Sequence, residues 1–158
     1  MGGAADAARL FSVSARSLVP LFLALSVAAC GTPTPTPAPA SLVSLRGEMA
    51  LLGVTTLSAV AGESACPDQA LHDNALALTV TTASDPQPRD VYLYLFRPRS
   101  FEETAPAMDA CAADYQAGSA GTIDRLDVAP FRAIGADWSD ELRESVEQAM
   151  QVAARGGR

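Results

Sequence analysis

The sequence predicts an α+β domain: an antiparallel sheet of about four to five strands, with two helices on one face and one disulfide. Three observations favour it. Two extended apolar segments follow one another between residues 76 and 96, helical periodicity appears only after residue 100, and two cysteines remain in the body of the chain. Strands that come early and helices that come late are typical of an antiparallel sheet covered by helices.

Residues 42–60 are predicted to form two strands, at 42–52 and 54–60. Gly47 and Gly53 interrupt this stretch, which disfavours one continuous helix. β-branched residues recur in its second half, and such residues pack well on a pleated sheet.

Residues 76–82 form the next predicted strand, because apolar and small or polar residues alternate there with a period of two. Residues 90–96 follow a proline-rich break and are apolar on both faces, which predicts a central strand antiparallel to its predecessor. A further strand is expected at 123–128. Pro130 either confines it to an edge of the sheet or ends it.

Two helices are expected in the second half of the chain. Apolar residues recur three and four apart over 101–115, and Pro106 places the regular part of this helix from Thr104 or Ala105 onward. Ser139 is a suitable N-cap for the last helix. Its predicted buried face comprises Leu142, Val146, Ala149, Met150 and Ala153.

The N-terminal region contains an uncharged, mostly apolar run at 17–29, preceded by Arg9 and Arg16 and ending at Cys30. This arrangement resembles the lipobox signal of bacterial lipoproteins, although Val27 stands where leucine is more usual. The resemblance covers residues 1–30 only. It implies that residues 1–29 are a cleaved signal peptide, that the Cys30 thiol is acylated, and that the protein is lipid-anchored on the extracytoplasmic side of a bacterial membrane, in the cell envelope. The alternatives are an ordinary secretory signal cut near Ala28 or Ala29, which leaves Cys30 as a spare thiol, and a short buried helix.

Residues 30–40 then form a lipidated cysteine and a Thr/Pro-rich linker, and 41–158 a single domain. Prolines alternate with threonine or alanine over residues 32–40, which favours extended polyproline II, so these nine linker residues span at most about 28 Å. From Cys30 onward, nine arginines face seventeen acidic residues, a formal net charge of −8. This charge argues against nucleic acid as a partner and against electrostatic attachment to anionic lipid. Anchoring therefore falls to the acyl chains.

Cys66 and Cys111 are expected to form a disulfide, because Cys30 is committed to lipid and an extracytoplasmic compartment permits disulfides. Closing a loop of about 45 residues is worth roughly 4 kcal/mol in the chain-entropy model. A metal or catalytic cysteine pair is the less favoured alternative, because the chain has one histidine and no Cys-x-x-Cys. No cofactor or metal is expected.

Candidate catalytic groups are sparse. His72 and Asp73 are the one neighbouring acid–base pair, with Ser64 and Ser84 as the nearest hydroxyls, and no Gly-x-Ser-x-Gly elbow is present. Carboxylates able to form a glycosidase-like pair are Glu102, Glu103, Asp109, Asp124 and Asp127. Each of these groups is more simply a solvated surface residue, so no catalytic residue is assigned.

A possible binding strip consists of Tyr92, Tyr94, Arg97 and Arg99, in which an aromatic strand face is followed by two cations. Core packing of the tyrosines under the helices is the favoured alternative. The leading expectation is a non-enzymatic envelope lipoprotein that binds a protein, glycan or small molecule. A small extracytoplasmic hydrolase and a purely structural lipoprotein are the alternatives.

Overall fold

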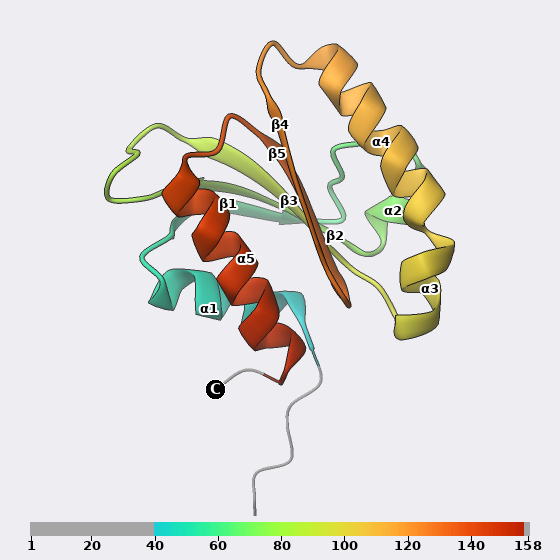
Figure 1. Ribbon diagram of the computed structural model, residues 1–158, viewed down its shortest axis with the longest axis horizontal. Coiled ribbons are helices and arrows are strands. Elements are labelled where there is room, and N and C mark those ends of the chain that lie inside the picture. Colours follow the sequence, from blue (N-terminus) through green and yellow to red (C-terminus); the bar gives the residue numbers. More distant parts are fainter. Residues whose placement is uncertain (1–39, 157–158) are drawn as a thin grey trace, which may run out of the picture. The chain divides into compact units, whose positions relative to one another are not determined.

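The computed structural model describes residues 40–156, which form an α+β domain around one five-stranded antiparallel sheet (Figure 1). The strand order is β1-β2-β3-β5-β4, so β3 is central and β1 and β4 are the edges. The elements are α1 (Leu42–Leu51), β1 (Thr55–Ala61), α2 (Gln69–His72), β2 (Ala75–Thr81), β3 (Arg89–Leu95), α3 (Pro98–Glu103), α4 (Ala105–Gly118), β4 (Ile123–Val128), β5 (Phe131–Ala136) and α5 (Asp140–Ala154).

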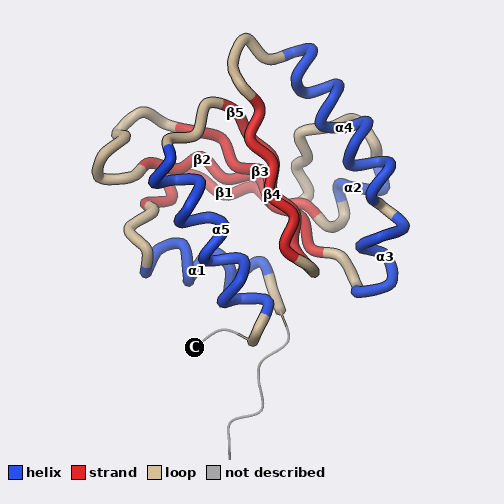
Figure 2. The backbone as a smooth tube through the Cα atoms, viewed as in Figure 1, coloured by secondary structure: helices blue, strands red, loops and turns tan. Residues whose placement is uncertain are grey.

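Helices cover both faces of the sheet (Figures 1 and 2). Two helices do lie on one face, as predicted, but they are α1 and α5, whereas α4 lies on the opposite face with α2 and α3. The alternation along β3 explains this arrangement. Val91 and Leu93 join the core under α1 and α5, while Tyr94 and Phe96 join a second core under α2–α4. A strand that is apolar on both faces needs cover on both.

The prediction of a strand at 42–52 is wrong, because α1 is a helix that begins in a capping box. The Ser41 Oγ accepts the Ser44 N–H at 3.0 Å, and the Ser44 Oγ accepts the Ser41 N–H at 3.2 Å. Leu45 and Met49, one helical turn apart, are fully buried against α5 and the sheet. Gly47 lies on the exposed side, where its lack of a side chain costs little packing.

The other predicted strands are confirmed, with β1, β2, β3 and β4 at the expected places and β2 antiparallel to β3. Sequence analysis missed β5, which follows Pro130 after a tight turn and pairs with both β3 and β4. Because β5 inserts between them, β4 becomes an edge strand, as Pro130 had suggested.

The three remaining expectations concern α4, α5 and the disulfide, and all three are confirmed. Helix α4 begins at Ala105, as Pro106 had indicated. Ser139 caps α5 by accepting the Leu142 N–H at 3.2 Å, and all five residues of the predicted face are buried. Cys66 and Cys111 are joined, with their Cα atoms 5.3 Å apart. The bond ties the loop before α2 to α4, across the second core.

Candidate functional site

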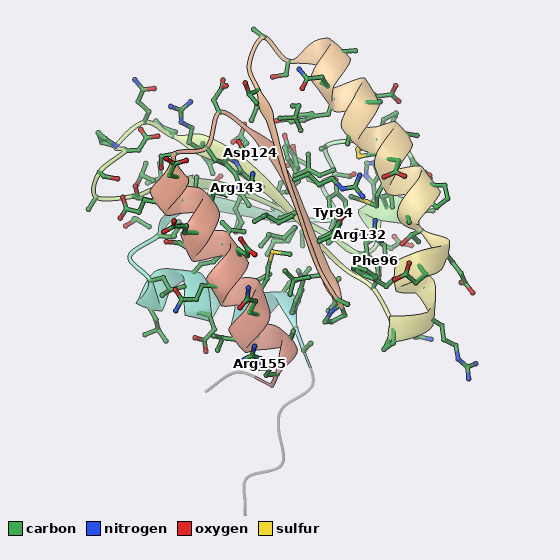
Figure 3. The ribbon with its side chains drawn as sticks, in the orientation of Figure 1. Tyr94, Phe96, Asp124, Arg132, Arg143 and Arg155 are labelled. Atoms are coloured by element: carbon green, nitrogen blue, oxygen red, sulfur yellow. A yellow bond between two sulfur atoms is a disulfide. The ribbon has the colours of Figure 1, made fainter. Side chains whose placement is uncertain are left out.

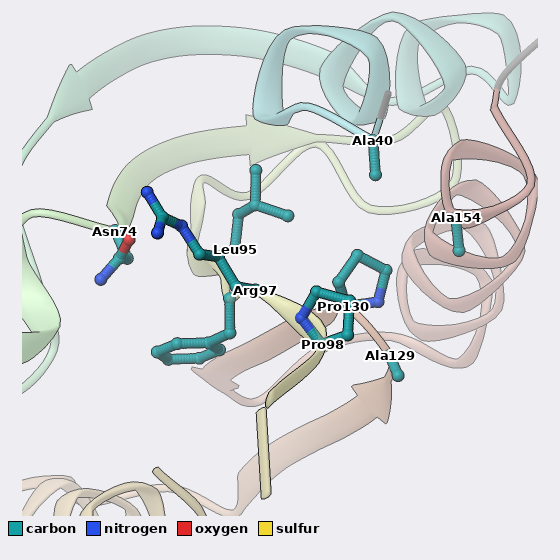
Figure 4. Close-up of a pocket in the computed structure, with 9 residues that line it drawn as sticks. Ala40, Asn74, Leu95, Arg97, Pro98, Ala129, Pro130 and Ala154 are labelled. Carbon is teal, nitrogen blue, oxygen red and sulfur yellow. The ribbon is translucent and has the colours of Figure 1, made fainter. Parts of the chain in front are cut away.

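An apolar hollow of about 610 Å³ lies at one end of the sheet (Figure 4). It is bordered by the residue before α1, the end of β3, the turn between β4 and β5, and the last turn of α5. Its lining residues are Ala40, Asn74, Leu95, Phe96, Arg97, Pro98, Ala129, Pro130 and Ala154. All but Asn74 and Arg97 are apolar. The volume is within the range of small-molecule sites.

Two features form the hollow: backbone hydrogen bonds hold the chain in place at the end of β3, and several of the side chains that line the hollow are small. Leu95 donates its N–H to the Asn74 carbonyl, and Phe96 donates to the Pro130 carbonyl, each at 3.0 Å. Pro98 then occupies the first turn of α3 and ends the extended segment. Alanines at 40, 129 and 154 leave open the space that larger side chains would fill.

Arg97 provides the positive charge at this hollow. It is exposed, and it also borders a neighbouring hollow of about 520 Å³, which Arg99 lines as well. An apolar floor with a guanidinium and the Asn74 amide at the rim suits a ligand with an apolar body and an anionic head, because guanidinium forms strong charge-assisted hydrogen bonds with carboxylate and phosphate.

The structure separates the four residues of the predicted binding strip. Tyr94 is fully buried, so its ring cannot reach a partner at the surface. Tyr92 is half-buried, and its ring packs edge-on against Tyr115 with centroids 5.7 Å apart. Burial raises the pKa of Tyr92, Tyr94 and Tyr115, the last to about 12. Of the four, only Arg97 and Arg99 are exposed, and both border a hollow.

Tyr94 holds the loop before α2 onto the sheet. Its hydroxyl accepts the Ala65 N–H at 3.0 Å and shares a hydrogen bond of 3.0 Å with the Ser64 Oγ. Its ring stacks on Phe96, with centroids 6.3 Å apart and planes 7° apart. Phe96 also lines the apolar hollow, so the second core and the hollow share one side chain.

His72 is engaged by backbone oxygens of the same loop. Nδ1 lies 3.2 Å from the Gly62 carbonyl oxygen, and Nε2 lies 3.0 Å from that of Cys66. The Ser64 hydroxyl, the candidate nucleophile, instead contacts Tyr94 and the Cys66 N–H. Ser84 bonds to the Glu141 carboxylate. The geometry therefore does not bring together the hydroxyl–imidazole pair that a serine hydrolase needs.

Three of the five candidate acidic residues take part in ion pairs, whereas Glu102 and Glu103 are exposed on α3. Asp109 and Asp127 both contact Arg125, at 2.5 and 2.9 Å. Asp124 pairs with Arg143 at 2.7 Å and accepts the Trp138 N–H (Figure 3). Although partial burial opposes it, the hydrogen bonds that Arg125 donates to Asp109 and Asp127 raise the pKa of Arg125. These ion pairs fasten β4 to α4 and α5.

Sequence analysis missed Arg132 on β5, whose side chain is only 3% exposed. Its guanidinium carbon lies over two aromatic rings, 4.2 Å from the Phe101 centroid and 6.0 Å from that of Phe96. Nη2 donates to the Phe101 carbonyl at 2.7 Å, and Asp127 lies 3.6 Å from Nε. The signal was the alternation within 131–136, which places residues 132 and 134 on the α4 side.

Cys30, the predicted lipidation site, lies outside the described residues. Within 40–156, no helix combines the length and hydropathy needed to cross a bilayer, and no three His, Cys, Asp or Glu side chains are grouped to hold a metal ion. Comparison with known proteins found no matching family model, curated protein or solved structure.

Proposed function

We propose that this protein is a membrane-anchored envelope lipoprotein whose domain binds an amphipathic anion, such as a fatty acid, in the apolar hollow beside Arg97. The observation that carries the proposal is the position of Ala40. This residue lines the hollow and is the last residue of the Thr/Pro-rich linker, so the linker joins the domain at the rim of the hollow.

The lipobox-like residues up to Cys30 support the anchor, and the linker sets the distance. An extended linker of nine residues holds its attachment point at most about 28 Å from the acylated cysteine. A hollow at that attachment point stays near the membrane surface, where amphipathic lipids and their products are the available ligands. Arg97 supplies the positive charge that a domain of strongly negative net charge needs to accept an anionic head.

The hydrolase alternative lacks such support, because both His72 ring nitrogens face backbone carbonyls and Ser64 bonds to Tyr94. A purely structural role would be served by a surface without a ligand-sized hollow. The apolar lining and the rim arginine favour a binding role over both alternatives.

The anchor is tested by mass spectrometry of the mature N-terminus. The expected species begins at Cys30 and carries acyl chains. Cys30→Ser should release the protein from membranes or leave the precursor uncleaved. An unmodified terminus at Ala29 or Cys30 would contradict the anchor without touching the binding proposal.

Binding is tested on the full chain in mild detergent, with a fluorescent fatty acid and the fatty alcohol of equal chain length as probes. Both should bind, the acid more tightly. Arg97→Gln should lower the affinity for the fatty acid about tenfold or more and leave the affinity for the alcohol unchanged, because only the acid loses a charge-assisted contact. Ala129→Trp, which fills the hollow from an exposed position, should abolish binding of both probes.

Arg99→Gln is the matched control, because Arg99 borders only the neighbouring hollow. It removes the same charge two residues away and should leave both affinities within about twofold. Equal weakening by Arg97→Gln and Arg99→Gln would indicate nonspecific attraction of anions. Absence of binding of either probe to the unmodified chain would refute the proposed ligand class.

A further inference from the structure

The two edges of the sheet differ in charge. Strand β4 carries Asp124, Arg125 and Asp127, and all three take part in ion pairs. Strand β1 carries no charged residue, and neither does any position from 49 to 62, in a chain of strongly negative charge. Charged side chains on an edge strand oppose pairing with another strand. Strand β4 therefore has this protection, and β1 does not.

The backbone of β1 is oriented to accept another strand. The Gly62 N–H donates to the Ala75 carbonyl at 2.9 Å, toward β2. Because backbone groups alternate sides along an antiparallel strand, Val60 also bonds toward β2, whereas the N–H and C=O of Ala59 and Ala61 point away from it. The register irregularity lies between residues 56 and 58, so residues 58–61 of β1 form a regular edge of the sheet.

Exposed apolar side chains surround this edge. The large apolar residues that are most exposed within 40–156 lie on α1 and β1: Val43 (75%), Leu51 (72%), Leu57 (56%) and Val60 (48%). A groove of about 740 Å³ separates the two elements and is lined on the helical side by Arg46, Gly47 and Ala50. Val60 borders a separate hollow, which Glu63 and Asp90 also line. Clustered exposure of this kind marks interaction surfaces.

We propose that β1 pairs antiparallel with β1 of a second copy of this chain across a two-fold axis at Val60. Ala59 then lies opposite Ala61 of the second copy, so that the outward backbone groups of both residues are satisfied on both copies. Because residues 49–62 are uncharged, the interface brings no acidic side chains together. A second copy offers an equally uncharged strand in the same membrane plane when both are lipid-anchored, which raises its effective concentration.

The register makes a specific test possible, because it places the two Val60 side chains directly opposite each other. Val60→Lys and Val60→Glu should each raise the dissociation constant of the dimer at least about tenfold, since like charges then oppose each other. Mixing the two variants should restore a dimer that contains one copy of each. The measurement is sedimentation of the full chain in mild detergent, with two affinity tags to identify the mixed dimer.

Ala113→Lys is the control, because it adds the same charge at an exposed position on α4 and should leave the dimer intact. Trp138 fluorescence checks that each variant is folded. A monomeric unmodified chain at all accessible concentrations would overturn the proposal. So would single variants that still dimerise, or a Val60→Lys and Val60→Glu mixture that stays monomeric.

Discussion

Removing the Tyr94 side chain should cost about 3–5 kcal/mol of unfolding free energy, because Tyr94 is fully buried and stacked on Phe96. Tyr94→Phe isolates the hydroxyl, which accepts the Ala65 N–H and bonds with Ser64. Both of these groups are half-buried, so water can replace part of the lost bonding. The expected cost of Tyr94→Phe is therefore about 1–2 kcal/mol.

Urea unfolding followed by fluorescence measures both variants, because Trp138 is the single tryptophan and lies in the core under α1 and α5. Tyr92→Phe is the matched control on the same strand, and its expected effect is within about 0.5 kcal/mol. Ser64→Ala combined with Tyr94→Phe should cost less than the two single changes together, since they share one hydrogen bond. An unfolding midpoint for Tyr94→Ala equal to that of the unmodified chain would refute the core assignment.

Three further predictions concern the sheet, the tyrosines and the disulfide. Gly135→Ala should destabilise the domain by about 1–3 kcal/mol in the same urea assay, because a Cβ there overlaps the Trp138 indole. Since burial raises the pKa of all three tyrosines, the unfolded chain should ionise first. The tyrosine contribution to the unfolding free energy should then be fully present below about pH 10 and be lost toward pH 12, and tyrosinate absorbance should appear at lower pH in urea than in buffer. Titration of the unfolded, unreduced chain without Cys30 should find almost no free thiol, and two reactive thiols would contradict the disulfide.

The parts of the fold that the sequence predicts well are those with a strong local pattern. Strand β2 alternates cleanly, and α5 combines a serine cap with an apolar stripe that is wholly buried. Helix α1 was misassigned because Gly47 and Gly53 look like breaks. Gly53 does lie beyond the helix end, with a positive φ of 86°, whereas Gly47 is tolerated on the exposed side. The deciding signal was the Ser41–Ser44 capping pair.

The candidate site is harder to predict, because its lining comes from residues between 40 and 154 that no local pattern relates. Small side chains such as Ala129 and Ala154 carry no chemical signal in the sequence. They matter only because the chain brings them to the same end of the sheet. Arg97 was named from the sequence because a cation beside an aromatic strand face could contact a partner, and this role stays a prediction; the hollow beside Arg97 was not foreseen.

The segment from Tyr94 to Arg97, at the end of β3, connects the stability of the domain to the geometry of the candidate site. It belongs partly to the core and partly to the surface. Tyr94 fixes the loop through its hydroxyl and supports Phe96 by stacking. Phe96 belongs to the second core and also forms part of the hollow, and the next residue, Arg97, reaches solvent. Because core packing is close and rigid, this succession holds the position of Arg97 relative to the apolar lining. Tyr94→Phe should therefore weaken fatty-acid binding under conditions where the domain remains fully folded, whereas the Tyr92→Phe control should not.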